Sequence, residues 1–468
     1  VDAVSVPEGF ETEAAIRSRL GKPEYELRMQ TWKLLDYTEQ GVRFTLSPDG
    51  RTHGVAYVPH GYPRVPEGER DLVDLTSMRK GPQASARDAV NYAGLQAGAS
   101  VVVFTPTGVD WLGHPYTIHD DLKARTVVFR NDELTVGFVG ADLFGMGWNE
   151  TYEMRRRAKE LGVDVLVIAM SHNHAAGDTI GVYGHYPAAY ITHIQDRITE
   201  GVRLALENLR PVHSIVAYSS ELPMDGTRVI DLFRNARNPG VLDPTFSVMQ
   251  VRAEGGIPIA TLVHFACHVE SLEAGPREIS ADFPGYMCDQ IAADGGGQAV
   301  FLNGAVGGMV SGDNFARTHG SSREMGLRLA ELVKDSLMKA TPAVGHAFSA
   351  AVRRIEIPVT NQDFAPLYES GLRNLYRGRV VSDMIYVRVA EAQFVTIPGE
   401  LLPEISFEIL EHMDGYPAML VGLANDELGY LIPPYDYRKG FYEESMSQGP
   451  SAGTQVRDMA IQMITEPD

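Results

Sequence analysis

Short apolar runs in this chain end in side chains that can bind a metal ion. Residues 163–170 form a continuous apolar run rich in β-branched residues, and His172 and His174 follow it directly. A run of this kind is typical of a strand that is buried on both faces. In open sheets with parallel strands, ligands bind beyond the carboxyl ends of the strands. The sequence therefore places two imidazoles where a functional site is expected.

The same arrangement recurs later in the chain. A zinc ion can be bound by imidazole nitrogens and carboxylate oxygens, with one position left open for water, and it does not need cysteine. His172 and His174 share one face of an extended chain but are separated along it, so we expect one to be a ligand and the other to have a different role nearby. The further apolar runs that lead to metal-capable residues are residues 257–266 before His268, residues 392–397 before Glu400 and residues 418–424 before Tyr430.

These motifs, in this order, resemble those of the neutral, non-lysosomal ceramidase family. The resemblance covers roughly residues 95–465 and consists of ordered short motifs rather than dense identity. One such motif is weak evidence, whereas several in the same order are specific. The similar segments are residues 171–174 (Thr-His-Thr-His in the family), 265–268 (Phe-Ala-x-His), 279–286 (Ser-Asp-x-x-Gly-Tyr), 398–400 (Pro-Gly-Glu) and 422–430 (Gly-Leu-x-Asn with a spaced Tyr).

The resemblance implies a zinc-dependent amidase. In the implied reaction the ion activates a water molecule that attacks an acyl carbon, Tyr442 stabilises the oxyanion, and His174 carries a proton to the leaving amine. The implied zinc ligands are His172, His268, Glu400 and Tyr430, and the residues implied to line the reaction site are His174 and Tyr442.

Three further residues are candidates for supporting roles. Arg234 and Arg237 lie near the position of an Asn-Arg segment that borders the active site in the family. Either could bind a substrate oxygen, and an equally good interpretation is that both are solvated surface residues. Asp282 is a candidate acceptor that would orient a ligand imidazole.

The chain also departs from the family pattern. Residues 304–311 read Gly-Ala-Val-Gly-Gly-Met-Val-Ser where the family has a segment such as Gly-Asp-Val-Ser-Pro-Asn, and Ala281 stands where the family has Ser. The residues after His174 differ as well. We therefore expect hydrolysis of an N-acyl amide in a small or lipid-like substrate, with ceramide as one case. The alternatives are a lactonase or esterase with the same zinc site, and a binding relative that has lost turnover.

Composition excludes several other classes of protein. The formal net charge of −20 repels phosphate backbones, so we expect no nucleic-acid partner. Two cysteines form neither a disulfide framework nor a cysteine zinc cluster, and we expect buried thiols. No apolar run approaches the roughly 20 residues that span a bilayer, and the start at Val1 lacks the pattern of a signal peptide. We expect a soluble protein, with the cytoplasm favoured and homo-oligomer formation left open.

The order of elements predicts an α/β fold with a mixed sheet flanked by helices, preceded by an N-terminal accessory α+β region. We place the accessory region at residues 1–93 and the catalytic region at residues 94–468. Because the chain ends soon after Met463, we expect no C-terminal β-sandwich domain of the kind that larger family members carry. The predicted elements are a helix over residues 11–39, a hairpin turn at 47–50, surface loop and short helix over 64–96, strands over 101–105, 124–129 and 134–141, a helix over 149–162 capped by Asn149, a helix over 191–209, and a helix to Lys339 with a capping box from Ser321 to Glu324.

Overall fold

The structure is a computed structural model in which the later four fifths of the chain are described almost throughout. It describes residues 94–467 apart from 108–110, 183–186, 273–277, 313–315, 365–367, 369–374, 376 and 439. Before residue 94 it describes residues 6–57 apart from 8, 24, 29–32, 38, 39, 41 and 48, together with 73, 74 and 92. The loop predicted over residues 64–96 lies mostly outside the described residues.

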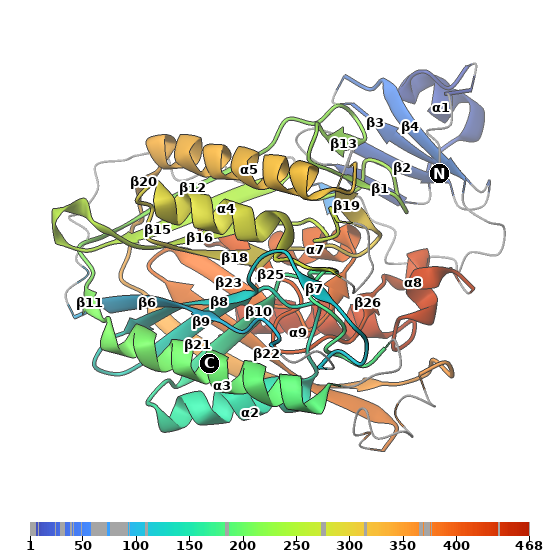
Figure 1. Cartoon of the computed structure of the whole chain (residues 1–468). Coiled ribbons are helices and arrows are strands. Elements are labelled where there is room, and N and C mark those ends of the chain that lie inside the picture. Colours follow the sequence, from blue (N-terminus) through green and yellow to red (C-terminus); the bar gives the residue numbers. More distant parts are fainter. Residues whose placement is uncertain are drawn as a thin grey trace.

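The first of three large mixed sheets contains the strand that leads to His172. Its strand order is β10-β9-β8-β6-β11, and β9 and β10 are parallel while the other pairs are antiparallel. Helices α2 and α3 lie side by side against one face of this sheet (Figure 1). The elements are β6 (Gln96–Val103), β8 (Lys123–Arg130), β9 (Thr135–Ala141), β10 (Val165–Met170), β11 (Arg210–Pro211), α2 (Trp148–Glu160) and α3 (Ala188–Glu207).

The second large sheet contains the strand that leads to His268. Its order is β18-β16-β15-β12-β20, and β16 and β18 form its parallel pair. Helices α4 and α5 pack on each other and cover this sheet on the side opposite α2 and α3 (Figure 1). The elements are β12 (Ser214–Glu221), β15 (Thr245–Arg252), β16 (Pro258–Phe265), β18 (Gln298–Asn303), β20 (Thr341–Pro342), α4 (Asp282–Ala293) and α5 (His319–Lys339).

The third large sheet contains the strands that lead to Glu400 and Tyr430. Its order is β21-β22-β23-β25, with β23 and β25 parallel, and α7 and α9 pack against it. Its elements are β21 (Phe348–Pro358), β22 (Arg379–Val389), β23 (Ala392–Thr396), β25 (Ala418–Val421), α7 (Pro403–Leu410) and α9 (Ala452–Thr465). Smaller elements are β7 (Thr117–Ile118), β13 (Arg228–Val229), β14 (Phe233–Asn235), β17 (Glu278–Ile279), β19 (Val310–Gly312), β24 (Glu400–Leu401), β26 (Tyr430–Leu431) and α8 (Tyr442–Ser445), with 3₁₀ turns at Glu254–Gly256 and Pro434–Asp436.

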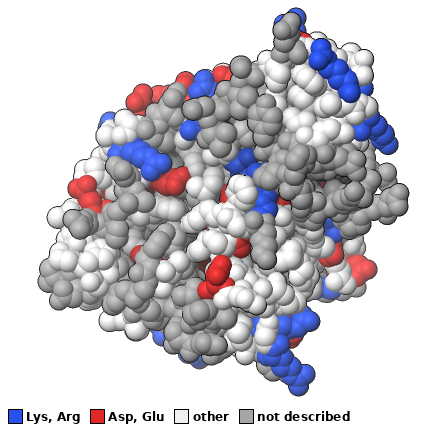
Figure 2. Space-filling view, turned by 90° about the vertical axis from the view of Figure 1, so that its right-hand side faces the viewer, with Lys and Arg blue, Asp and Glu red and all other residues white. Residues whose placement is uncertain are grey.

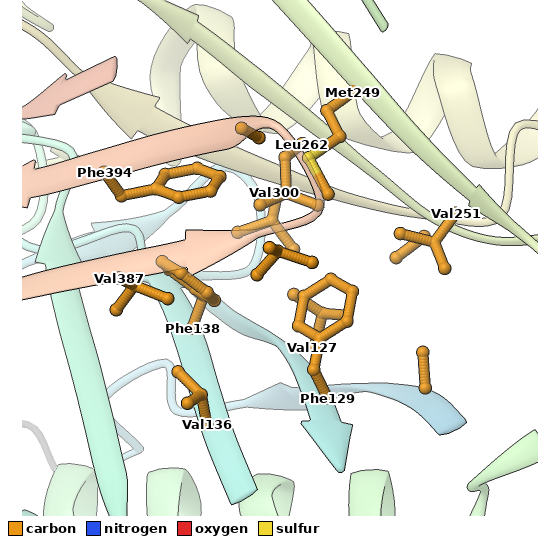
Figure 3. Close-up of a cluster of buried hydrophobic side chains, with 14 of the residues drawn as sticks. Val127, Phe129, Val136, Phe138, Met249, Val251, Leu262, Val300, Val387 and Phe394 are labelled. Carbon is orange, nitrogen blue, oxygen red and sulfur yellow. The ribbon is translucent and has the colours of Figure 1, made fainter. Parts of the chain in front are cut away.

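The three large sheets share one hydrophobic core. Phe138 of β9 is fully buried, and its ring centroid lies 4.8 Å from that of Phe394 in β23 and 6.3 Å from that of Phe129 in β8. Leu262 and Val300 of the second sheet belong to the same cluster (Figure 3). The predicted α/β class is therefore confirmed, but three mixed sheets stand where one was expected.

The N-terminal region forms a separate small sheet with the order β4-β3-β2-β1-β5, which packs on α1. The helix predicted over residues 11–39 is wrong, because α1 ends before Gly21, whose φ of 84° no helix accommodates. The hairpin turn at residues 47–50 is confirmed, since it joins β3 to β4. The elements are α1 (Glu13–Leu20), β1 (Tyr25–Arg28), β2 (Lys33–Tyr37), β3 (Val42–Leu46), β4 (Thr52–Tyr57) and β5 (Val73–Asp74).

The predicted helix starts were less accurate than the helices themselves. Gly147 occupies the N-cap of α2, so Asn149 lies inside the helix and does not cap it. The capping box of α5 is formed by Thr318 and Ser321, three residues before the predicted one. Serine occupies the third position of this box, where Glu or Gln is usual, so the sequence motif did not predict this capping box.

Charged side chains of both signs are interspersed on the face shown in Figure 2, so the net negative charge does not form one acidic patch among the described residues there. Cys267 and Cys288 are buried free thiols, as predicted. In the part of the chain that the structure describes, no helix combines the length and apolar character needed to cross a bilayer.

Phe138→Ala is expected to destabilise the protein by about 3–5 kcal/mol, because it removes an aromatic ring from the core that all three sheets share. A fall in the denaturation midpoint and the apparent melting temperature would report the loss. Val101, which is 44 % exposed on β6, supplies the control, since Val101→Ala is expected to change stability by no more than about 0.5 kcal/mol. Equal effects of the two substitutions would contradict the shared core.

Candidate active site

The carboxyl ends of strands from all three sheets meet at one place. The Asn303 side chain, at the end of β18, donates to the carbonyl oxygens of Ser171 and Cys267 at 2.9 and 3.0 Å. It therefore ties the segment after β10 to the segment after β16. A bridge between Ala169 and Ala424 connects β10 to the segment after β25. These contacts hold the residues that follow the strands next to one another.

His172 and His268 present the same ring nitrogen to this meeting point. His172 Nδ1 lies 2.8 Å from the carbonyl oxygen of Phe144, and His268 Nδ1 lies 3.3 Å from that of Val310. A carbonyl oxygen only accepts, so each Nδ1 donates a proton, and the lone pair of the neutral ring is on Nε2. The φ of 63° at His172 is a left-handed conformation that costs on the order of 1–3 kcal/mol in a residue other than glycine. Such strain is concentrated at functional sites.

Glu400 is held opposite these imidazoles by a short parallel sheet. In this sheet β24 pairs with β26, and Glu400 is in register with Tyr430. Glu400 Oε2 lies 2.9 Å from His268 Nε2 and 3.6 Å from His172 Nε2. A Cβ atom on Gly307 would lie only 2.7 Å from the Glu400 carbonyl oxygen, so a larger residue there would displace the strand that carries the carboxylate.

The imidazole nitrogens and carboxylate oxygens that meet at this point have too few protons for all of them to form hydrogen bonds with one another. The ligand atoms of His172, His174 and His268 lie within 4.8 Å of one another. His174 Nε2 is buried and has no hydrogen-bond partner among the described residues, whereas the Glu400 carboxylate has partners in His268 and Tyr430. A proton on His268 Nε2 would satisfy Glu400 but would leave the other imidazole lone pairs unpaired. One divalent cation would bind these lone pairs together, so the donor set fits a metal ion with nitrogen and oxygen ligands.

The pKa shifts of two of the three imidazoles are consistent with this fit, and that of the third depends on Glu400. Burial, with the neighbouring His174 and His268, holds the pKa of His172 well below its ordinary range. Burial and His268 lower the pKa of His174 to about 4. Burial also disfavours the charged form of His268, but the hydrogen bond and negative charge of Glu400 outweigh it and raise its pKa. The neutral imidazoles of His172 and His174 are the form that binds metals.

Tyr430 and Tyr442 stand beside the same group. Tyr430 is buried, its hydroxyl hydrogen-bonds to Glu400, and it lies 3.5 Å from the sulfur of Met309. Burial, reinforced by the charge of Glu400, holds the pKa of Tyr430 well above its ordinary value. The Tyr442 ring lies 6.0 Å from that of Tyr430, and the residue as a whole is 56 % exposed.

A cavity of about 560 Å³ opens over these residues. Its volume lies within the range of small-molecule pockets, which is about 300–1,000 Å³. Four of the site residues, His172, His174, Glu400 and Tyr430, line it together with Tyr442. The rest of the lining combines apolar side chains with a few charged ones, among them Trp148, Ile180, Phe364, Tyr368, Leu428, Met446, Glu150, Arg354, Glu356 and Glu427.

Arg234 and Arg237 are not among the described residues that line this cavity. Arg234 lies exposed on β14. Arg237 is buried, and its guanidinium lies 2.8 Å from Asp436, 2.9 Å from Glu443 and 2.6 Å from Glu444. A guanidinium that three carboxylates already engage is a poor ligand for a substrate oxygen. The structure therefore separates both arginines from the site residues, and any role for them in substrate binding stays a prediction.

Arg237 belongs to a larger buried group that we call the carboxylate–guanidinium cluster. Arg438 Nη2 lies 3.0 Å from Asp436 Oδ1, which is the same carboxylate that Arg237 contacts. Burial and the neighbouring charge of Asp436 raise the pKa of Glu404 to about 7. The members of the cluster are Arg43, Arg237, Arg438, Glu404, Asp436, Glu443 and Glu444.

The expectation that Asp282 orients a ligand imidazole is wrong. Its carboxylate accepts hydrogen bonds from the hydroxyls of Ser271 and Ser322 and from the backbone N–H of Leu272. Backbone carbonyls orient the imidazoles of His172 and His268 instead. Carbonyl partners leave no trace in the residue types, so the sequence could not indicate them.

Two polar residues at this site were missed by the sequence argument. Glu270 hydrogen-bonds to Ser311 and interacts electrostatically with His268 and His174. It follows His268 by two residues, a spacing that puts both side chains on one face of an extended chain, and this spacing could have identified it. Asn303 carried no such signal, because a single asparagine at a strand end is common.

A second group of potential ligands lies nearer the surface and consists of His119, Glu278 and His319. The two imidazoles stack with centroids 3.5 Å apart and planes inclined by 19°. Nearly parallel rings direct their lone pairs side by side rather than toward one point. His319 hydrogen-bonds to Glu278 at 2.8 Å, so this group is a poorer metal site than the one under the cavity.

Solved structures with a similar fold include a neutral ceramidase and a second ceramidase. The neutral ceramidase from Pseudomonas aeruginosa matches with a TM-score of 0.67 and 16% identity, over 81% of this chain and 74% of that one. A ceramidase complexed with C2 matches with a TM-score of 0.65 and 17% identity, over 79% and 75% of the two chains. No family model and no curated protein matches the sequence. This chain has the neutral ceramidase fold, and the predicted resemblance is confirmed at that level.

Glu404→Gln is expected to flatten the dependence of stability on pH. The pKa of Glu404 is about 7 in the folded protein against an ordinary value of 4.5, so the fold favours the protonated carboxyl. The wild-type protein therefore loses stability as the pH rises from about 4.5 through about 7. Glutamine does not titrate, so the variant should lose less between pH 5 and pH 8. Melting temperatures at the two pH values measure the difference, and the exposed Glu411→Gln is the control; an unchanged profile in Glu404→Gln would contradict the shift.

Proposed function

We propose that this chain is a zinc-dependent hydrolase that cleaves an N-acyl amide bond. The observation that carries the proposal is the convergence of His172 Nε2 and His268 Nε2 on Glu400 Oε2, at 3.6 and 2.9 Å, beside an open cavity. The fold supports the same class of reaction, because the structures it resembles are described as ceramidases.

The proposed zinc ligands are His172, His268, Glu400 and Tyr430. Nitrogen and oxygen donors of this kind suit zinc in hydrolytic enzymes, which keep one coordination position open. When bound, zinc polarises an acyl carbonyl and supplies a hydrolytic nucleophile from water. Two distances favour His172 and His268 over His174 as ligands, since it is their Nε2 atoms that approach the Glu400 carboxylate.

The other residues act on protons and charge. The buried Nε2 atom of His174 faces the metal site without a partner among the described residues, so the ring can take a proton and pass it to the leaving amine. An amine leaves poorly without that proton. Tyr442 lines the cavity and is exposed, and its hydroxyl is the group that would donate a hydrogen bond to the oxyanion that forms at the acyl carbon.

The cavity lining supports an N-acyl substrate with an apolar acyl chain and a polar amine part, ceramides included. Trp148, Ile180 and Phe364 provide apolar surface for the chain. Arg354 and Glu356 provide charged groups for polar atoms of the amine part. This division of the lining fits an amphiphilic molecule better than a wholly apolar one.

The purified wild-type protein is expected to contain about one equivalent of zinc and to hydrolyse an N-acyl amide such as a short-chain ceramide. A chelator should abolish turnover, and added zinc should restore it. The amide and the ester with the same acyl chain are assayed together. Turnover of the ester alone would replace the amidase proposal with an esterase, and a folded protein without zinc or turnover would overturn it.

His268→Ala is expected to lose both the bound zinc and all measurable turnover, because it removes a ligand that also contacts Glu400. Zinc is measured by atomic emission and turnover by product formation. His213→Ala, at an exposed histidine outside the site, is the matched control and should retain both. Stoichiometric zinc in His268→Ala would contradict the ligand assignment.

His174→Asn separates proton transfer from metal binding. If His174 moves a proton and is not a ligand, the variant retains its zinc while kcat falls by about 10²–10⁴-fold. The zinc content and kcat of one preparation are compared with those of His268→Ala. Loss of zinc to the level of His268→Ala would show that His174 is itself a ligand.

A further inference from the structure

One arginine of the N-terminal sheet is buried against acidic residues of the later part of the chain, which forms the candidate site. Arg43, on β3, has a side chain that is only 2 % exposed. Its Nη1 atom lies 3.7 Å from Glu404 Oε1 and 3.7 Å from Asp436 Oδ1. Arginine is almost never fully buried unless it is paired, and these two carboxylates are close enough to offset its buried charge.

Arg43 offsets an excess of negative charge in the carboxylate–guanidinium cluster. Without it, the guanidinium groups of Arg237 and Arg438 would face the carboxylates of the cluster alone. Burial first, and then the charge of Asp436, raise the pKa of Glu404, while Arg43 and Arg237 lower it. Asn238 provides only neutral hydrogen bonds to Glu404 and Asp436, at 2.6 and 3.0 Å. Removal of Arg43 would therefore leave buried carboxylates in repulsion.

The same cluster holds the segment that carries Tyr442. Glu443 and Glu444 follow Tyr442 directly in α8, a helix of four residues without a side-chain cap. Their carboxylates are fixed by Arg237 at 2.9 and 2.6 Å. So short a helix is not stable by itself, and its position depends on these tertiary contacts. The exposed Tyr442 ring follows the position of its two buried neighbours.

We infer that the N-terminal region positions the Tyr442 segment of the active site, and that Arg43 is the positioning residue through which it acts. Arg43 lies on β3 of the small N-terminal sheet, and Glu404 and Asp436, which it faces, lie far later in the chain, in α7 and in the 3₁₀ turn after β26. Neither of these two carboxylates belongs to a proposed metal ligand. The effect of Arg43 on catalysis rests on the proposed function, whereas its effect on the Tyr442 segment does not.

The first test measures position independently of activity. Hydrogen exchange is followed by mass spectrometry in peptides that cover residues 434–448 and residues 165–175 of the full-length protein. Arg43→Met is expected to speed exchange in the first peptide and to leave the second unchanged. Arg51→Met is the matched control, because Arg51 directly precedes β4 of the same N-terminal sheet and its side chain is 77 % exposed. Unchanged exchange over residues 434–448 would overturn the inference, even if the protein proves to have no hydrolase activity.

The second test measures kcat, KM and zinc content. Arg43→Met is expected to lower kcat by about 10–100-fold with full zinc content, because a small displacement of a catalytic group has effects of this size. Arg43→Lys, which keeps the charge, should recover part of the loss. In a Tyr442→Phe background, Arg43→Met should lower kcat no further, as residues that act through one another are not additive. Independent effects in the double variant, or an unchanged kcat in Arg43→Met, would overturn the inference.

A buried arginine can also be needed for folding. If Arg43→Met yields no folded protein, the double variant Arg43→Met with Glu404→Gln removes one of the two facing charges and is used instead. Its exchange over residues 434–448 is compared with that of Glu404→Gln alone. Faster exchange in the double variant supports the inference, and equal exchange overturns it.

Discussion

The candidate site is built around nitrogen and oxygen lone pairs of histidine and glutamate side chains. These atoms lie close together and have too few protons for hydrogen bonds among all of them. His172 and His268 give their Nδ1 protons to backbone carbonyls, and Glu400 brings a carboxylate to within 3.6 and 2.9 Å of the Nε2 atoms that remain. Such an arrangement is unfavourable in the absence of a cation and strongly favourable in its presence. The left-handed backbone at His172, and also at Leu423 and Asn425 nearby, indicates that the fold accepts local strain to build it.

The arrangement of the three sheets explains how residues so far apart in sequence reach one point. Each large sheet contributes one parallel strand pair, and the segments that follow these pairs are connected by Asn303 and by the Ala169–Ala424 bridge. A shared core that includes Phe138 and Phe394 fixes the sheets relative to one another. Rigid packing on this scale is what lets ligands from separate strands be held within a few tenths of an ångström.

Sequence reasoning named the histidines and the glutamate that the structure brings together, but it missed the residues and contacts around them, for physical reasons. Apolar runs that end in His172, His268 and Glu400 are local patterns, and local patterns survive in a sequence. The number of sheets, the carbonyl partners of the imidazoles and the pairing of Arg237 with Asp436 arise only when distant segments meet, so no spacing encodes them. The helix predicted over residues 11–39 failed because charged residues are common to helices and to exposed strands, whereas the left-handed Gly21 decides the outcome.

The candidate metal ligands and the Tyr442 segment are held in place by different interactions. This difference is why the N-terminal region could affect one of them without the other. His172, His268 and Glu400 are fixed by strand ends and backbone hydrogen bonds, which a change elsewhere in the chain affects little. Tyr442, by contrast, stands on a short helix whose neighbours are fixed by ion pairs in a buried cluster with more carboxylates than guanidinium groups can easily balance. Buried ion pairs are strongly weakened when one partner is removed. The proposed metal binding and the proposed oxyanion stabilisation would therefore fail separately, and the second is the one that the inferred role of Arg43 would affect.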